Sequence, residues 1–420
     1  MQKLLENLNS DSTSERLTAL AELVQKVDKP VPRDNDANNH IHTIYSFSPY
    51  SPAKATYMAY VSGLTSAGIM DHDSLSGVKE FKKACEIVNI GSTSGVEVRV
   101  KCAKGYGRIN HPDQEECLYM AAHGVAERYV DDFNAYLAYY RGKRNERNKK
   151  MCDLITEKFG RFGITLDFDL DVYPLSRAEE GGTITERHLL YALAKKLAER
   201  FGQTPDLIHF LQNDLALEVS PKIEGYLLDK ENPHFLYDLL GVLKADTKFF
   251  YIDADEEMPD AEEFVKIAES FGAIPAYAYL GDVGNSVTGD KKTQKFEDDY
   301  LEDLMIDLKK VGFRAIAYMP TRNTREQLER VQALCRKYGF FEICGEDVNS
   351  PRQKFTCDAL ADPAYSHLIE STWALIGHEY IVNLEGVEAG MFSATTISEM
   401  PNLQDRIKKY ASIGRNTIIK

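Results

Sequence analysis

The feature that most constrains the fold is an alternation of short apolar runs with helical segments, which occurs in two blocks of the chain. In residues 34–126, the runs GLTSAGIMDHD and GVEVRV flank the helical segment GVKEFKKACEIV. In residues 247–358, helix is followed by strand twice, in DLKKVGFRAIAYMP and REQLERVQALCRKYGFFEICG. Strands that alternate with helices form a mostly parallel sheet or barrel. We therefore predict an α/β fold in which the two blocks build one distorted barrel.

The segment between the two blocks, residues 127–246, has a different character. Its sequences ERYVDDFNAYLAYYRGKRN and TERHLLYALAKKLAERFG have helical periodicity, and no convincing strand repeats between them. We predict that this segment is a helical insertion. Residues 1–33 are predicted to form an N-terminal helix and linker, and residues 359–420 a C-terminal helical extension without a recognisable motif.

Composition limits the classes of function. With 420 residues and 43% hydrophobic content, the chain can bury a large core. A net charge of −15 argues against duplex nucleic acid as a partner, whereas metal ions could still make a pocket attractive to a phosphorylated molecule. The seven cysteines include no C-x-x-C pair, which is typical of reduced thiols in the cytoplasm. The sequence also shows no secretion signal and no apolar run of membrane-spanning length, so we predict a cytoplasmic protein without membrane contact.

A pair of histidines stands where the first strand is predicted. In His40-Ile41-His42 the two imidazoles point to the same side of the strand. Two neutral imidazoles on one side can bind one metal ion, although an H-x-H pair also arises by chance. Asp347 follows another predicted strand, FFEICG, at the end where α/β barrels place their active sites.

Other ionisable residues stand at or near further strand ends. His72 follows the apolar stretch GLTSAGIM, where the ordinary alternative is a capped turn. Glu97 and Arg99 alternate with valines, so they form the charged face of a strand that points either to solvent or into a barrel. For Arg99 the alternative to phosphate binding is a salt bridge across the strand. His123 ends the run LYMAA, a position that structural histidines often occupy.

Taken together, five segments resemble, in order and spacing, the motifs of the polymerase-and-histidinol-phosphatase (PHP) superfamily. They are NNHIHTIYSFSPYSP, GIMDHDSLSG, GVEVRV, GAIPAYAYLGD and CGEDVNSP. The resemblance implies a distorted (β/α)7 TIM-like barrel and metal-dependent hydrolysis of phosphoesters. In the insertion, RGKRNERNKKMCDLITEKFGRFGI and GGTITERHLLYAL resemble the Arg-rich helix and the Arg-Pro-His segment of the subgroup that acts on nucleoside bisphosphates and RNA ends.

The resemblance also implies a set of metal ligands. The first site consists of four residues that are all present: His40, His42, Glu97 and Asp347. A second site would add His123 and a histidine whose position holds Tyr279, and a phenol is a poor ligand unless the metal deprotonates it. A third would need His72 and a final histidine, replaced here by Asn349. We therefore expect one firmly bound divalent ion (Mn, Zn, Fe or Mg) and at most a second, weaker one.

The function implied is a metal-dependent phosphoesterase in which metal-activated hydroxide attacks a small phosphorylated or nucleotide-like substrate. His72, His188 and Arg99 are the expected catalytic residues, with His188 presented to the substrate phosphate by the insertion. Arg187 stands one position from the arginine of the subgroup motif. Two alternatives stay open: a degenerate relative that binds a metal or ligand without catalysis, and an enzyme acting on another substrate.

Overall fold

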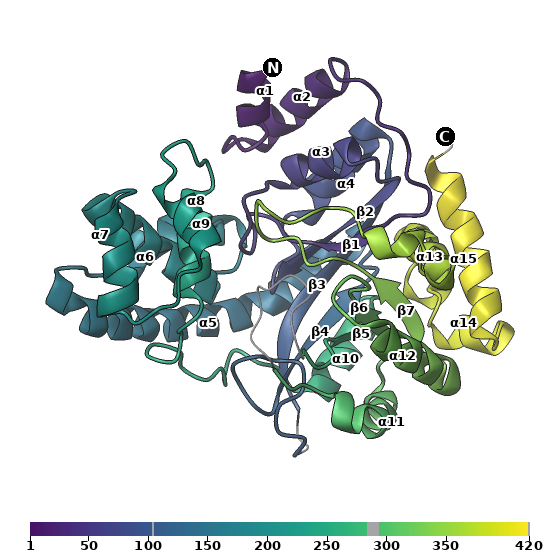
Figure 1. The fold of residues 1–420 in the computed structure, drawn as a ribbon. Helices are drawn as coiled ribbons and strands as arrows, with labels where there is room; N and C mark the ends of the chain where they lie inside the picture. Colours follow the sequence, from purple (N-terminus) through teal and green to yellow (C-terminus); the bar gives the residue numbers. More distant parts are fainter. Residues whose placement is uncertain (103–104, 284–293, 419–420) are drawn as a thin grey trace.

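In the computed structural model, residues 1–102, 105–283 and 294–418 are described, and they are built around one curled sheet of seven strands (Figure 1). The strands follow one another in the sheet in the order in which they occur in the chain. Their bounds are β1 (Asn38–Ile41), β2 (Ser66–His72), β3 (Gly91–Lys101), β4 (Cys117–His123), β5 (Ile274–Tyr279), β6 (Ala315–Tyr318) and β7 (Phe341–Cys344).

The sheet is not a closed barrel, and it is not wholly parallel. β4 runs antiparallel to both of its neighbours, whereas all other pairs are parallel. The described residues between β3 and β4 contain no helix. Parallel neighbours need a crossover connection, so two strands joined by a loop pair antiparallel. Among the described residues, β1 and the segment after β7 share one β-bridge, between Ile41 and Val348. The predicted distorted barrel is therefore correct as a curled α/β sheet and wrong as a closed ring.

Helices cover the outer face of the sheet because its apolar side chains point outward between them. In β3, Val96, Val98 and Val100 lie in the main apolar core, while Glu97 and Arg99 are buried on the concave side. The covering helices are α3 (Pro52–Val61), α4 (Val78–Val88), α10 (Ala261–Ser270), α11 (Leu301–Val311) and α12 (Arg325–Tyr338). The charged face of this strand thus faces the interior of the curl, as a barrel requires and a solvent-exposed strand does not.

Residues 127–246 contain helices and no strand. They pack around an apolar cluster of their own, which includes Ile155, Leu193 and Leu239. The helices are α5 (Val130–Phe159), α6 (Glu186–Phe201), α7 (Pro205–His209), α8 (Pro221–Leu228) and α9 (Phe235–Leu243). In Figure 1 they project to one side of the sheet, and the long α5 connects them to it.

The N-terminal helices pack on the outside of the sheet against α4, whereas the C-terminal helices pack on its concave side, against Ile274, Ala315 and Phe341. Arg16 of α2 (Thr13–Val24), which follows α1 (Gln2–Asn7), makes a buried ion pair with Glu80 of α4. At the other terminus, Glu379 of α13 (Ser366–Glu385) accepts a hydrogen bond of 2.7 Å from the backbone N–H of Ser94 in β3. α14 (Ala394–Glu399) and α15 (Leu403–Ile418) follow, and Gly377 and Gly414 let α13 and α15 approach closely. Within the described part of the chain, every helix is too short or too polar to cross a bilayer.

Candidate metal centre

Five side chains that can bind metal ions converge on the concave side of the sheet. They come from the ends of β1 and β2, from β3, and from the loop after β7: His40, His42, His72, Glu97 and Asp347. One carboxylate oxygen of Glu97, Oε2, lies 3.7 Å from Nε2 of His40, 3.9 Å from Nε2 of His42 and 3.2 Å from Nδ1 of His72. Oδ1 of Asp347 lies 3.2 Å from Nε2 of His42. Two overlapping groups of three ligands result, and both contain His42.

The pKa shifts of these groups show that they are electrostatically coupled. Burial acts to lower the pKa of His40, but the carboxylate of Glu97 outweighs it and raises that pKa. Burial acts to raise the pKa of Glu97, but the neighbouring His40 and His72 outweigh it and lower that pKa to about 2. Burial also acts to raise the pKa of Asp347, yet the neighbouring imidazoles of His42 and His40 hold that pKa well below the usual value. Burial lowers the pKa of His72, so this ring is neutral. Ionised carboxylates beside a neutral imidazole are the forms that bind a divalent metal.

A chain of two hydrogen bonds fixes the tautomer of His42. The hydroxyl of Ser46 donates its one proton to Oδ1 of Asp71, at 2.6 Å. That hydroxyl lies 3.2 Å from Nδ1 of His42, so it accepts from an Nδ1–H group. The lone pair of His42 is therefore on Nε2, the atom that faces Glu97 and Asp347. A histidine held in this way by a hydroxyl and a carboxylate is characteristic of metal ligands.

His123 lies at the same cavity but outside both groups of three ligands. Its ring is 2% exposed, and burial lowers its pKa to about 3, so it is neutral. Nε2 of His123 is buried and has no hydrogen-bond partner in the described structure. A buried polar atom without a partner is rare in proteins and marks a place where a ligand or ion completes the structure.

The two residues that replace expected histidines are held in other contacts. The hydroxyl of Tyr279 donates to Asp298 at 2.6 Å, and burial raises its pKa further above the usual value. The amide of Asn349 donates to Oδ1 of Asp347 at 2.5 Å. Both side chains are thus held by hydrogen bonds to carboxylates. The side chain of Asn38 donates to the backbone carbonyl of Glu346 and accepts from its backbone N–H, both at 3.0 Å.

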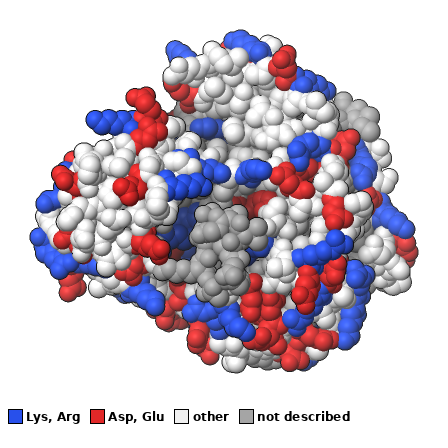
Figure 2. All heavy atoms as spheres, viewed as in Figure 1, with Lys and Arg blue, Asp and Glu red and all other residues white. Residues whose placement is uncertain are grey.

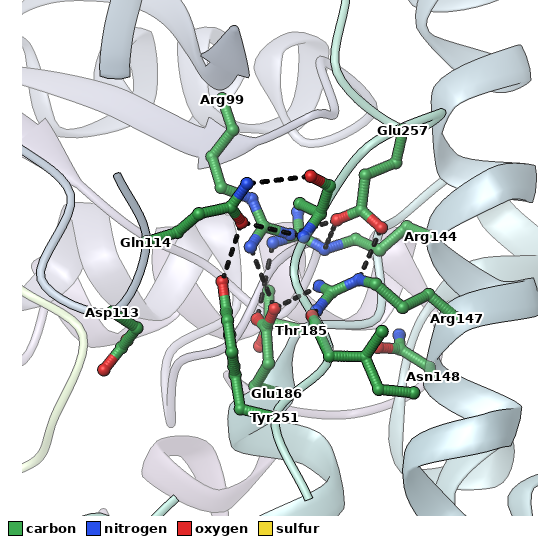
Figure 3. Close-up of polar contacts among 12 residues, drawn as sticks. Arg99, Asp113, Gln114, Arg144, Arg147, Asn148, Thr185, Glu186, Tyr251 and Glu257 are labelled. Carbon is green, nitrogen blue, oxygen red and sulfur yellow. Dashed lines mark hydrogen bonds and ion pairs between the residues drawn. The ribbon is translucent and has the colours of Figure 1, made fainter. Parts of the chain in front are cut away.

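Arg99 does not face the metal ligands with a free guanidinium. It pairs with Glu186 at 3.0 Å and with Glu257, and both carboxylates also contact Arg147 (Figure 3). Arg144 reaches Glu186 at 3.4 Å. These contacts favour the salt-bridge alternative for Arg99, with partners from the insertion and the following loop rather than from across the strand. The sequence could not supply those partners, because they are distant along the chain.

His188 is buried, and it lies neither in solvent nor among the residues that line the cavity. Its Nδ1 accepts the backbone N–H of Thr185 at 3.0 Å, which caps α6, and its ring packs edge-on against Phe47 at 4.9 Å. The adjacent Arg187 does line the cavity, and its positive charge contributes to lowering the pKa of Asp347. Arg187, rather than His188, therefore lies at the cavity, and His188 caps the N-terminus of α6.

The metal ligands open into a cavity of about 570 Å³ between the sheet, the insertion and the loops after β5, β6 and β7. Among the cavity residues that sequence reasoning missed are His111, Tyr119 and Arg322. Nδ1 of His111 accepts the backbone N–H groups of Asp113 (3.2 Å) and Gln114 (3.0 Å), and its ring stacks on Tyr119 at 4.9 Å. His111 belongs to an irregular segment without any strand signal. Arg322 follows the run AIAYMP, so its position after a strand was a usable signal.

Comparison with protein-family models finds no match, and neither does comparison with curated proteins. Two solved structures are similar in fold. One, from Bifidobacterium adolescentis, is assigned as a metal-dependent phosphoesterase; it is 18% identical, with a TM-score of 0.51 over 80% of this chain and 96% of that one. The other is an amidohydrolase from Chromobacterium violaceum with bound sulfate and no metal; it is 17% identical, with the same TM-score and the same coverage. At these identities the likeness concerns the fold.

Proposed function

We propose that this protein is a metal-dependent hydrolase of the PHP type and that it acts as a phosphoesterase on a small phosphorylated substrate. The observation that carries the proposal is the convergence of His40, His42, Glu97 and Asp347, with His42 held in the tautomer that a ligand needs. The unpartnered Nε2 of His123 supports a second, weaker position.

A divalent ion fits these residues, since imidazole nitrogens and carboxylate oxygens are ligands of Mn, Zn, Fe and, for the carboxylates, Mg. His40, His42, Glu97 and Asp347 would hold it. When bound, such an ion polarises a phosphoryl oxygen and activates a water molecule. His72 is neutral beside Glu97, so it serves as a ligand or a proton acceptor rather than as a proton donor.

The similar structures support the reaction class without defining the substrate. One is assigned as a metal-dependent phosphoesterase, and the amidohydrolase binds sulfate, a tetrahedral dianion like phosphate. On the face shown in Figure 2, basic and acidic side chains are interspersed. Such a surface suits a small substrate better than duplex nucleic acid, which requires clustered positive charge.

A non-catalytic metal-binding protein is the second candidate. It is favoured by Tyr279 and Asn349, which occupy two expected ligand positions with side chains that are already hydrogen-bonded. This protein would bind an ion through His40, His42 and Asp347 and hydrolyse nothing.

Metal content and hydrolysis distinguish the two candidates. The purified protein is analysed for bound metals, reloaded with Mn²⁺, and assayed with p-nitrophenyl phosphate and bis(p-nitrophenyl) phosphate. Asp347→Ala and Glu97→Gln should lose both metal and activity, whereas the exposed His209→Ala should keep both. Bound metal without hydrolysis of either ester would select the second candidate. Hydrolysis that persists in a chelator, or in Asp347→Ala, would overturn the metal-dependent mechanism.

A further inference from the structure

The cations that line the cavity are not equivalent. Five lysine or arginine side chains lie in its wall: Arg99, Arg144, Arg187, Lys244 and Arg322. A phosphate ester needs cations that are not already neutralised, because a bound carboxylate competes for the same N–H groups. The contacts of each side chain therefore indicate which of them can bind the substrate.

The inner arginines are neutralised by carboxylates. Figure 3 shows Arg99, Arg144 and Arg147 pointing toward one another around Glu186 and Glu257. Arg147 lies 2.5 Å from Glu257 and also contacts Glu186, and Arg144 contacts Asp73 as well. The three guanidinium groups thus meet the three carboxylates of Asp73, Glu186 and Glu257. A substrate phosphate would have to displace a buried carboxylate to reach them.

Arg187 and Arg322 are different, because neither has a carboxylate within 4.0 Å among the described residues. Arg187 comes from the start of α6, and Arg322 from the loop after β6. Both side chains line the same cavity as Asp347, one of the candidate metal ligands.

Each of the two arginines is placed as an anion ligand would be. Arg187 is the second residue of α6, where the helix dipole is positive and a cation is unfavourable unless an anion approaches. Nε of Arg322 donates to the carbonyl of Leu280 at 3.1 Å, and its guanidinium lies 5.8 Å from the ring of Phe296. The hydrogen bond to Leu280 holds Arg322 through Nε. Its two terminal nitrogens have no protein acceptor in the described structure.

We propose that Arg187 and Arg322 form the phosphate-binding pair of this cavity and that the substrate carries a single phosphoryl group. This inference rests on the proposed phosphoesterase function. The two guanidinium groups bind the phosphoryl oxygens beside the metal ligands, from the insertion and from the sheet. The remainder of the substrate faces an inner wall in which Arg99 and Arg144 are neutralised, so a second phosphate has no free arginine there.

The first test measures phosphate binding directly, without turnover. Inorganic phosphate is titrated by calorimetry into the Mn²⁺-loaded protein and into Arg187→Gln, Arg322→Gln and the double variant. A hydrogen bond to a charged group contributes about 1.5–3 kcal/mol, so each single variant should bind about 10- to 100-fold more weakly. Arg187→Lys and Arg322→Lys should lose less, because they keep the charge without the planar fork. Arg330→Ala, in α12 after the loop that holds Arg322 but outside the cavity, is the matched control.

The second test compares adenosine 5′-monophosphate with adenosine 3′,5′-bisphosphate. We expect the additional phosphate to change affinity by less than about threefold, because the inner arginines are neutralised. Wild-type affinity in both glutamine variants, or no phosphate binding by the wild type, would overturn the arginine pair. Bisphosphate binding more than about tenfold tighter would overturn the single phosphoryl group. If phosphate binding depends on both arginines but no ester is hydrolysed, the proposed function fails while this inference stands.

Discussion

Replacing Ser46 with alanine removes the hydroxyl between Asp71 and His42, and we expect metal binding to weaken although no metal ligand changes. In the native protein, Ser46 donates to Asp71 at 2.6 Å and accepts from Nδ1 of His42 at 3.2 Å. Without this acceptor, the ring gains more by placing its proton on Nε2, which lies 3.2 Å from the carboxylate of Asp347. That tautomer has no lone pair on the atom that faces the metal position.

The magnitude follows from the hydrogen bond that must be broken before a metal can bind. A hydrogen bond from Nε2–H of His42 to the ionised Asp347 is of the charge-assisted kind, which contributes about 1.5–3 kcal/mol. Metal affinity should therefore fall about 10- to 100-fold, the range found when partners of ligating histidines are removed. His42 is only 1% exposed, so bulk solvent hardly reaches its ring in the native structure.

The assay is a competition titration of Mn²⁺ or Zn²⁺ against a chelator of known affinity. Ser48→Ala is the matched control, because Ser48 is buried in the same loop but accepts only a long hydrogen bond of 3.4 Å from the backbone of Tyr50. We expect Ser48→Ala to bind metal as the wild type does. Equal metal affinity in Ser46→Ala and Ser48→Ala would refute the role of Ser46 in fixing the tautomer of His42.

Three further changes test other parts of the structure. Glu297 is buried, which raises its pKa from 4.5 to about 7. Between these two pH values the folded protein holds a proton that the unfolded chain has released. The protonated Glu297 therefore contributes at most about 3 kcal/mol to the free energy of unfolding. This contribution is complete below pH 4.5 and is lost as the pH rises through 7. Urea unfolding should show a smaller loss of stability over this interval for Glu297→Gln, and an unchanged slope would contradict this. Tyr279→Phe should lower the free energy of unfolding by about 1 kcal/mol, through loss of the bond to Asp298, and leave metal content unchanged; a fall in bound metal would identify Tyr279 as a ligand. Arg99→Met should destabilise the fold by about 3–5 kcal/mol in thermal or urea unfolding, because it leaves Glu186 and Glu257 with one cation fewer. The exposed Arg161→Met is the control, and we expect it to change stability by less than about 1 kcal/mol. A change that small in Arg99→Met would show that its ion pairs contribute little.

Much of the candidate site could be predicted because strand periodicity is local. The spacing of His40 and His42 places both rings on one side of β1, and the alternation in GVEVRV places Glu97 opposite the valines. Asp347 stands shortly after an apolar strand, so recognising that strand was enough to predict its location at the edge of the sheet. These are properties of neighbouring residues, and the structure brings all four side chains together.

The errors concern contacts between distant segments. Arg99 is neutralised by Glu186 and Glu257, which are 87 and 158 residues away along the chain. His188 turns toward its own helix cap and Phe47, and Arg187 faces the cavity, a choice that depends on the orientation of α6 against the sheet. A local pattern does not specify the direction in which a helix presents its first turn.

The sequence by itself determined the α/β alternation and the helical character of residues 127–246, because each depends on the period of a strand or helix, whereas the choice of candidate metal ligands came from the resemblance to the PHP motifs. The tertiary structure alone decided that the sheet stays open beside a single bridge at Ile41 and Val348. It also decided which arginines are free, since a guanidinium binds an anion only when packing leaves it without a carboxylate. Arg187 and Arg322 satisfy that condition. They come from the insertion and from the loop after β6, so only the packing of these two parts brings them to one cavity.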